Sequence, residues 1–241
     1  MPDNEVTSVA EYIQLVKGFS PPTKKTWFRG QLNAMWTLQP SVRRHAQWMD
    51  AEVQMLNRFR QLTVSRVPNP PHQDDDWGWV CLAQHHRLPT RLLDWTENPL
   101  VALFFAVEKD EDQDGRVFAL DVHGLNRKSY GSDVGVLLLG RDERLDNYSP
   151  YARDGARASP LAVIAPQTFD RVVAQAGTFS LSHHNEDTEL DAFAGTLIET
   201  WDVPLTAKED IRLELVKLGI HAASVYPDLD HIAFMIRDEL I

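Results

Sequence analysis

The sequence has little cysteine and no long apolar run. Cys81 is the one cysteine among 241 residues, so the chain cannot form an internal disulfide. It lies in an apolar segment, residues 79–83, where we expect an unreactive core thiol. The most apolar run, residues 99–107, is far shorter than the roughly 20 residues of a membrane-spanning helix. The first twelve residues are acidic and lack a secretory pattern, so we expect a cytoplasmic protein that does not bind membranes.

Basic side chains are also scarce. Lys and Arg number 24 against 35 Asp and Glu, which gives a net charge of −11. A charge of this sign repels phosphate backbones at long range, so general nucleic-acid binding is not expected. The hydrophobic fraction of 43% and the charged fraction of 24% are those of an ordinary globular protein. A chain of this length and composition can bury a large core.

Several common catalytic motifs are absent. The sequence contains no P-loop, no glycine-rich dinucleotide fingerprint, no G-x-S-x-G elbow and no H-E-x-x-H pair. The pairs His85–His86 and His183–His184 are adjacent residues, which point about 100° apart on a helix. Neither pair forms the i, i+4 face that zinc favours, so we expect no metal site.

Helix and strand signals are interleaved without a regular βαβ rhythm, which predicts an α+β fold of mixed sheets with interleaved helices. Helices are expected at residues 9–18, 49–65, 77–86, 99–109, 206–218 and from 228 onward. Strands are expected at residues 26–29, 115–122, 134–139, 161–165, 171–180, 196–203 and 220–226, and residues 123–160 are interpreted as mostly loop. No repeat or linker interrupts the pattern, so we expect a single domain over residues 1–241, with residues 1–24 as an N-terminal helix and lead-in.

The most informative stretch runs from Gln84 to Thr96. It places eight polar or titratable side chains between two segments that are expected to be buried helices. Buried polar groups need partners, so this stretch either lines a pocket or ties one helix to the next. We expect Asp94 to be a mostly buried carboxylate that accepts hydrogen bonds from Arg91 or from backbone amides near Thr96. The role of a structural anchor is favoured over that of a solvated group in a ligand cleft.

Two further clusters are candidates for binding. Arg29 is flanked by aromatic residues and followed by Gly30, an arrangement that can hold a phosphate or a carboxylate because glycine lets a ligand approach the backbone. A structural salt bridge is an equally good interpretation. Residues 171–179 alternate like a strand with Gln175 and Gly177 on one face, which is typical either of close approach by a ligand or of a β-bulge.

Taken in order, these clusters resemble the FRG domain family, which is named after a triplet that stands here as Phe28-Arg29-Gly30. The resemblance covers about residues 25–235 and is carried by Phe28-Arg29-Gly30-Gln31, Trp36-x-Leu38-x-Pro40-Ser41, Gln84-His85-x-x-Leu88-Pro89-Thr90-Arg91-Leu92-Leu93-Asp94-Trp95-Thr96, Asn98-Pro99-Leu100-x-Ala102-Leu103-x-Phe105-Ala106, Arg171-x-x-x-Gln175-x-Gly177-x-Phe179, and Leu218-Gly219-Ile220 with Tyr226-Pro227-Asp228-Leu229-Asp230. One position departs from the family pattern: Arg87 stands where the family usually has glycine.

FRG domains are distantly similar to the ADP-ribosyltransferase fold, in which a split sheet holds NAD in a cleft. The resemblance implies that Arg29 grips the phosphates or ribose of NAD. It also implies that residues 90–96 correspond to the second-strand motif, and that Gln175 lies on the strand that usually carries the catalytic glutamate. Gln175 can orient a ribose hydroxyl but has no charge, so Glu199 is a candidate substitute. The remaining expected ligand-binding residues are Gln31, Gln84, His85, Thr90, Arg91, Asp94 and Thr96.

The function that this resemblance implies is that of an NAD-dependent ADP-ribosyltransferase or NAD glycohydrolase, with NAD as substrate and a toxin or anti-phage defence role. Its partners would be the nucleotide ligand together with a protein acceptor or an antitoxin. The alternative is a non-catalytic nucleotide-sensing or protein-interaction domain that has kept the cleft without turnover. The missing glutamate in residues 171–179 favours that alternative.

Overall fold

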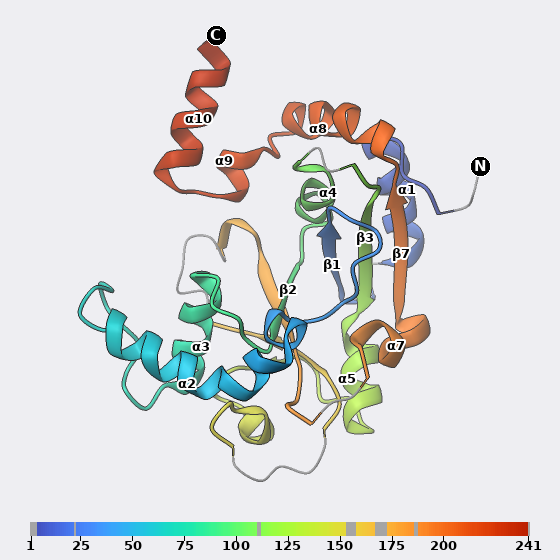
Figure 1. The fold of residues 1–241 in the computed structure, drawn as a ribbon. Helices are drawn as coiled ribbons and strands as arrows, with labels where there is room; N and C mark the ends of the chain where they lie inside the picture. Colours follow the sequence, from blue (N-terminus) through green and yellow to red (C-terminus); the bar gives the residue numbers. More distant parts are fainter. Residues whose placement is uncertain are drawn as a thin grey trace.

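The computed structural model describes residues 4–21, 23–109, 112–152, 158–166, 173–185 and 188–240. These residues form an α+β fold around a seven-stranded sheet with the order β4-β5-β6-β2-β1-β3-β7 (Figure 1). The paired strands are antiparallel except for β4 and β5, which are parallel. The prediction of a mixed sheet with interleaved helices is therefore confirmed.

The strands are β1 (Thr26–Gln31), β2 (Leu92–Thr96), β3 (Gly115–Asp121), β4 (Leu137–Leu138), β5 (Leu161–Ile164), β6 (Gly177–Leu181) and β7 (Ile198–Val203). The α-helices are α1 (Val9–Phe19), α2 (Ala46–Thr63), α3 (Asp76–His85), α4 (Pro99–Val107), α5 (Val122–Tyr130), α7 (Leu190–Ala194), α8 (Lys208–Lys217), α9 (Ala222–Val225) and α10 (Leu229–Leu240). Short 3₁₀ turns lie at η1 (Ser41–Arg44), η2 (Glu143–Tyr148), η3 (Gly195–Leu197) and η4 (Leu205–Ala207). No helix in this described part of the chain has both the length and the apolar character needed to cross a membrane.

The sheet separates into two halves between β1 and β2. β1 pairs with β3 along all six of its residues, whereas it meets β2 at the single pair Phe28–Thr96. β2 in turn pairs with β6 along its whole length. The two strands therefore diverge after Phe28, and the backbone of the central sheet opens next to Arg29 and Asp94.

The helices pack so that a space remains over this opening. Phe28 of β1 packs in a core with α1, α4 and α8, and Leu92 of β2 packs in a second core with α2 and α3. Phe28 lies opposite Thr96, and Leu92 lies an even number of residues from Thr96, so both cores cover the same face of the sheet. A third core around Trp27 and Trp95 covers the opposite face with α5 and α7. α3 and α4 therefore flank the point where β1 and β2 separate (Figure 1).

Helix α4 lies directly on β1 and β3 because glycines leave room for it. A Cβ atom added to Gly30 would lie 1.8 Å from the carbonyl oxygen of Ala102, and one added to Gly115 would lie 2.3 Å from that of Ala106. Gly30 therefore allows a helix to pack against the strand, and the expectation that it lets a ligand approach the backbone stays a prediction. Asn98 and Pro99 start α4 as predicted, since the Asn98 side chain accepts a hydrogen bond from the Leu100 amide at 3.0 Å.

Several sequence-based boundaries were wrong. The helix α5 lies in a region interpreted as loop, and residues 222–225 form the helix α9 instead of a strand. β6 begins at Gly177 instead of residue 171, and Arg171 lies outside the described residues. The helix expected from residue 206 begins at Lys208 without a side-chain cap, because residues 205–207 form a 3₁₀ turn.

Candidate functional site

A cavity of about 250 Å³ opens between α3 and α4, where β1 and β2 separate. Its walls come from β1, α3, β2, α4 and the segments around β5 and β6. The lining residues are Phe28, Arg29, Gly30, Cys81, Gln84, His85, Arg87, Asp94, Trp95, Thr96, Phe105, Ala165, Pro166, Gln175 and Phe179. Polar groups therefore converge from several elements onto a space with aromatic walls, which is the usual composition of a small-molecule site.

Arg29 and Asp94 both line this cavity. The Arg29 Nη1 donates a hydrogen bond to the backbone carbonyl oxygen of Asp94 at 2.7 Å, so the guanidinium bridges the gap between β1 and β2. The Arg29 Nε is buried and has no hydrogen-bond partner among the described residues. Burial lowers the pKa of Arg29, the Asp94 carboxylate opposes that shift, and Arg44 adds to it. A buried donor without a partner is costly, so this guanidinium is suited to receive an acceptor from a ligand.

The Asp94 carboxylate faces the cavity and is exposed. It accepts a hydrogen bond from the Gln84 Nε2 at 2.9 Å, and the Gln84 Oε1 accepts a hydrogen bond from the Thr90 hydroxyl. The predicted buried anchor is therefore wrong. Asp94 is a solvent-accessible carboxylate. The buried Thr90 holds the Gln84 side chain, and Gln84 in turn orients the Asp94 carboxylate.

Arg91 has a different partner from the predicted one. Its guanidinium forms a bidentate ion pair with Glu52 of α2 and donates a hydrogen bond from Nη1 to the Tyr148 carbonyl oxygen at 2.6 Å. The Arg91 and Glu52 side chains are 5% and 2% exposed, and neither residue lines the cavity. The expected Arg91–Asp94 pair is thus replaced by a buried pair that joins the residue before β2 to α2.

His183 and His184 lie near this ion pair and are neutral at pH 7. His183 is fully buried, and its ring contacts those of Tyr148 and His184. Burial lowers the pKa of His183 to about 4, with further lowering by His184 and Arg91. Burial and Arg91 also lower the pKa of His184. Both imidazoles are therefore neutral around the Arg91–Glu52 pair at pH 7.

Gln175 lies in the cavity wall, but on a turn before β6 instead of on the strand. Its carbonyl oxygen accepts a hydrogen bond from the Thr96 hydroxyl at 2.6 Å, and its side-chain Nε2 donates to the Val225 carbonyl oxygen at 3.2 Å. The following residue, Ala176, has a φ of 45°, so the backbone is left-handed directly before Gly177. Through the hydrogen bond of its side chain to Val225, Gln175 joins the cavity wall to α9.

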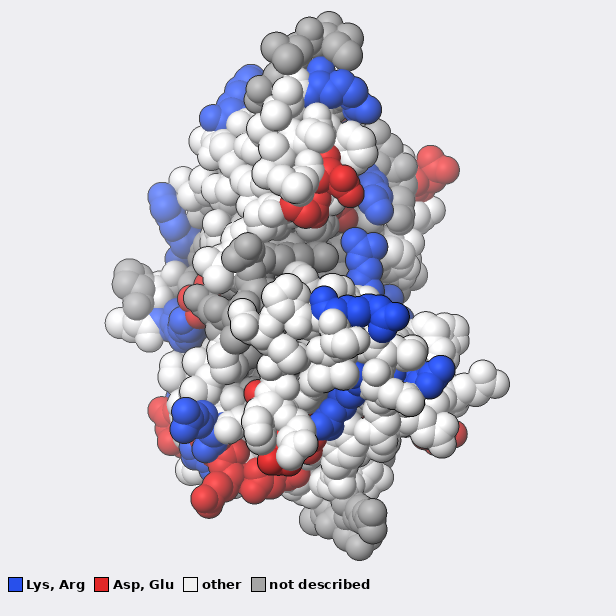
Figure 2. Space-filling view, turned by 90° about the vertical axis from the view of Figure 1, so that its left-hand side faces the viewer, with Lys and Arg blue, Asp and Glu red and all other residues white. Residues whose placement is uncertain are grey.

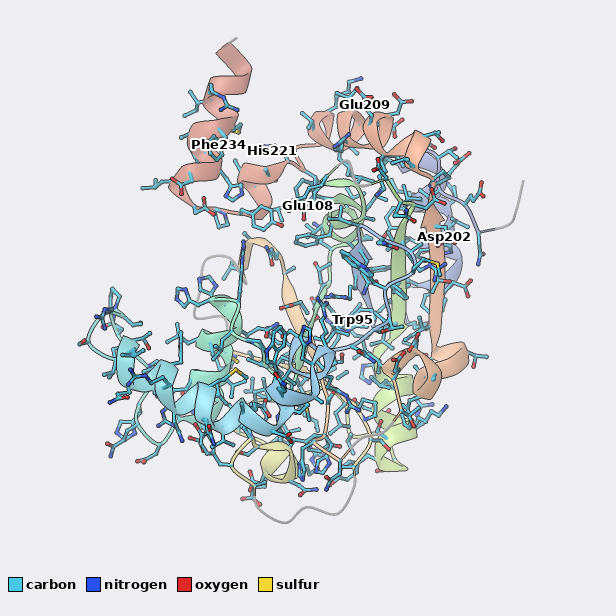
Figure 3. All side chains as sticks on the ribbon, viewed as in Figure 1. Trp95, Glu108, Asp202, Glu209, His221 and Phe234 are labelled. Carbon is cyan, nitrogen blue, oxygen red and sulfur yellow. The ribbon has the colours of Figure 1, made fainter. Side chains whose placement is uncertain are left out.

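The segment after α9 also packs on the cavity wall. The Tyr226 ring packs edge-on against Phe105, with ring centroids 6.0 Å apart, and its hydroxyl donates a hydrogen bond to the Glu108 Oε2 at 2.7 Å. Figure 3 shows Glu108 and His221 where α4 approaches the C-terminal segment. Phe234 lies farther out on α10 and is 53% exposed. The C-terminal family block therefore contributes to the site through α9 and Tyr226.

Four candidate residues do not line the cavity: Thr90 and Arg91, described above, and Glu199 and Gln31. Glu199 is on β7, at the edge of the sheet, where it pairs with Ala119 of β3. Gln31 is buried at the end of β1, and its Oε1 has no hydrogen-bond partner among the described residues. Neither residue lines the cavity, so Glu199 is not placed to substitute for a glutamate there.

Arg87 occupies the conformation that its usual glycine would favour. It follows α3 with a φ of 64°, lines the cavity and is exposed. The turn therefore requires a left-handed backbone, and this chain accepts the associated strain while placing a cation at the site.

We expect Arg87→Gly to be more stable than Arg87→Ala by about 0.5–1 kcal/mol, because glycine adopts this backbone without steric strain. Urea unfolding of the two variants measures the difference. Both variants remove the guanidinium, so the comparison isolates the backbone. Equal stability of the two would show that the turn relaxes without a left-handed residue.

Sequence reasoning missed several wall residues. Cys81 was assigned to the core, yet it lines the cavity; burial raises its pKa to about 12, with contributions from Asp75 and Asp94, so it stays a neutral thiol. Phe105 and Phe179 lie in segments that resemble the FRG pattern, and this resemblance was a signal that both residues belong to the site. Among the described residues no group of His, Cys, Asp and Glu could hold a metal ion.

Comparison with known proteins agrees with the motifs. Residues 24–115 match the model of the FRG domain family, so this segment of the chain is similar to an FRG domain. The matched segment contains β1, α3, β2 and α4, which supply Arg29, Gln84, Asp94 and Phe105 to the cavity. No curated protein and no solved structure matched the chain.

Proposed function

We propose that the cavity binds NAD and that the protein is an NAD-dependent ADP-ribosyltransferase or NAD glycohydrolase. The observation that carries this proposal is the meeting of Arg29 and Asp94 in one cavity, where a sheet opens between two helices. One group is a half-buried cation whose buried Nε lacks a described partner, and the other is an exposed carboxylate. Together they can hold an anionic nucleotide and stabilise a cationic sugar.

The reaction requires few protein groups. The bond between ribose C1′ and the nicotinamide nitrogen breaks, and its electron pair leaves with neutral nicotinamide. The resulting oxocarbenium-like ribose is attacked at C1′ by water or by an acceptor nucleophile, which then loses a proton. Asp94 would stabilise the positive charge, and Arg29 would hold the phosphates in position.

In this proposal Asp94 has the role for which Gln175 and Glu199 were considered. Gln175 is uncharged and its amide nitrogen is bonded to Val225, while Glu199 is on the far edge of the sheet. Asp94 is the acidic residue in the cavity wall, and Gln84 fixes the direction of its carboxylate. The corresponding biological role would be that of a toxin or anti-phage effector with a protein acceptor or an antitoxin as partner.

The second candidate function is nucleotide sensing without turnover. It is favoured by the contact between Gln175 and Val225, which couples the cavity wall to the helices α9 and α10 at the C-terminal end. A ligand that displaced this contact would change the position of those helices. A small ligand is favoured over a nucleic acid, because the net charge of the chain is −11. Figure 2 shows Lys and Arg dispersed among neutral side chains on one face, with Asp and Glu at several places on it.

Incubation of the purified protein with NAD tests the proposal. The reaction is run without cell lysate and with lysate added as a source of acceptors. We expect chromatography to show release of free nicotinamide. NAD binding without nicotinamide release would favour the sensing function. Absence of both binding and release would contradict the two functions together.

A further inference from the structure

A second, larger cavity of about 830 Å³ adjoins the first. It lies between the end of α2, the following proline-rich segment and α3. Its lining residues are Phe59, Thr63, Arg66, Val67, Pro68, Asn69, Pro71, Asp75, Trp77, Gly78, Cys81, Leu82, His85, His86, Leu139 and Pro166. Cys81, His85 and Pro166 line both cavities, so the two spaces meet at these residues.

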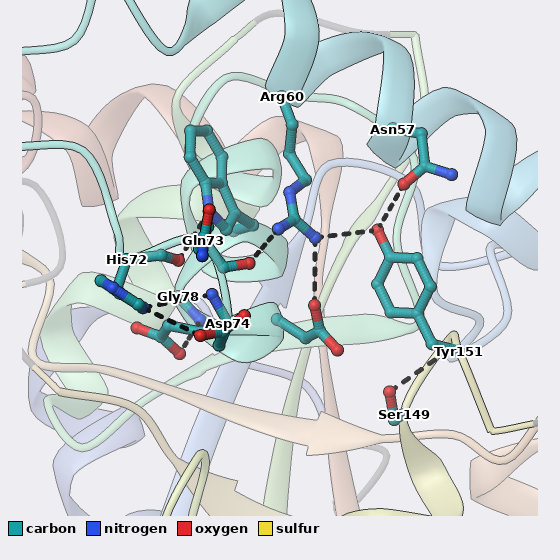
Figure 4. Close-up of polar contacts among 11 residues, drawn as sticks. Asn57, Arg60, His72, Gln73, Asp74, Gly78, Ser149 and Tyr151 are labelled. Atoms are coloured by element: carbon teal, nitrogen blue, oxygen red, sulfur yellow. Dashed lines mark hydrogen bonds and ion pairs between the residues drawn. The ribbon is translucent and has the colours of Figure 1, made fainter.

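The wall of the second cavity is held in place by a hydrogen-bonded network around Arg60 (Figure 4). Arg60 of α2 donates hydrogen bonds to the Asp76 carboxylate at 3.0 Å and to the Gln73 carbonyl oxygen. The Tyr151 hydroxyl lies within 3.4 Å of the Arg60 Nη1 and donates to the Asn57 Oδ1 at 3.0 Å. These bonds connect α2, α3 and the segment between them. The cavity is therefore preformed by a braced loop, which lowers the ordering cost of binding a ligand.

The two cavities differ in chemistry in a way that fits a ligand with two different ends. The first carries the Arg29 and Asp94 pair. The second is lined mainly by apolar and aromatic side chains, including Phe59 and Trp77, with the exposed Arg66 among its lining residues. Flat heteroaromatic rings stack on such walls.

The volumes of the two cavities also fit a ligand that occupies both of them. The first cavity, at about 250 Å³, lies below the range of about 300–1,000 Å³ that is typical of sites enclosing a whole drug-sized ligand. A dinucleotide cannot be enclosed there completely. The adjoining cavity, which meets the first at His85, supplies the missing space.

We propose that the two cavities form one dinucleotide site, in which the nicotinamide nucleotide occupies the cavity of Arg29 and Asp94 and the adenosine half occupies the cavity between α2 and α3. This assignment rests on the proposed function and adds the location of the second half of the substrate. The pyrophosphate lies between Arg29, which holds it, and His85, which lines both cavities. The α2–α3 segment thereby distinguishes a dinucleotide from a mononucleotide.

The first test uses the unaltered chain and calorimetric titration with nicotinamide mononucleotide, AMP and NAD. We expect AMP to bind with the same affinity whether or not nicotinamide mononucleotide is saturating, and NAD to bind more tightly than either. Competition between the two mononucleotides would place both in one cavity and overturn the assignment. Failure of nicotinamide mononucleotide and NAD to bind at all would instead contradict the proposed function, and the assignment with it.

The second test fills the larger cavity with Thr63→Trp. Thr63 lines this cavity near the end of α2, and its hydroxyl bonds to the Phe59 carbonyl oxygen of its own helix, so its replacement removes no contact between elements. We expect NAD affinity to fall about tenfold to hundredfold, the range for loss of one base-stacking contact, while nicotinamide mononucleotide binds as before. The matched control is Gln54→Trp, at an exposed position of α2 outside both cavities. Unchanged NAD affinity in a folded Thr63→Trp variant would overturn the assignment.

Discussion

Replacement of Arg91 by alanine is expected to lower the free energy of unfolding by about 3–5 kcal/mol, because it leaves the Glu52 carboxylate buried without its cation. Glu52 is 1% exposed, and its carboxylate receives hydrogen bonds from the Arg91 Nε and Nη2. The same substitution removes the hydrogen bond to the Tyr148 carbonyl oxygen, which connects β2 to η2. Chemical unfolding followed by tryptophan fluorescence measures the loss.

The control for this prediction is Arg144→Ala. Arg144 pairs with Asp142 through two hydrogen bonds, but its side chain is 38% exposed, so its loss should cost less than about 1 kcal/mol. The double variant Glu52→Met with Arg91→Met should recover much of the stability, since it removes both buried charges. Equal losses for Arg91→Ala and Arg144→Ala would show that the buried pair has no special structural role.

The helices with clear end signals were predictable from sequence. The Ser8 side chain accepts a hydrogen bond from the Glu11 amide at 3.2 Å, and Asn98 caps α4, because these short polar side chains satisfy backbone donors next to them in the chain. α5 was missed although Asp121 caps it and Gly131 ends it with a φ of 78°. Its apolar residues do recur at helical spacing, but it also holds a glycine and several polar residues, and this low apolar content favoured the interpretation as loop.

The site was predictable only in part, because its polar contacts depend on distant residues. Arg29 and Asp94 belong to two family blocks, and their meeting followed from the family resemblance. The partner of Arg91 lies 39 residues away on α2, so spacing within the block favoured Asp94 instead. A signal existed: Glu52 precedes Leu56 by four residues on the buried face of an amphipathic helix, where a carboxylate needs a cation.

Asp94→Asn is expected to lower the rate of nicotinamide release about 100- to 1000-fold, the usual effect of removing one group that stabilises charge in the transition state. The amide has the shape of the carboxylate and can still accept the hydrogen bond from Gln84 through its oxygen. NAD binding should change little, because the phosphates are assigned to Arg29. Steady-state kinetics should therefore show a lower kcat with a nearly unchanged KM.

The stability of Asp94→Asn distinguishes this role from that of a structural anchor. Asp94 is exposed and has no ion pair with Arg91, so the free energy of unfolding should change by less than about 0.5 kcal/mol. Asp50→Asn is a matched control, because Asp50 is exposed on α2 outside both cavities and its substitution changes the net charge equally. A fall of several kcal/mol with unchanged turnover would restore the anchor role, since it would mean that the carboxylate stabilises the junction of β1 and β2. Loss of turnover in both variants would indicate that the overall charge, and not the position of Asp94 beside Arg29, determines the rate.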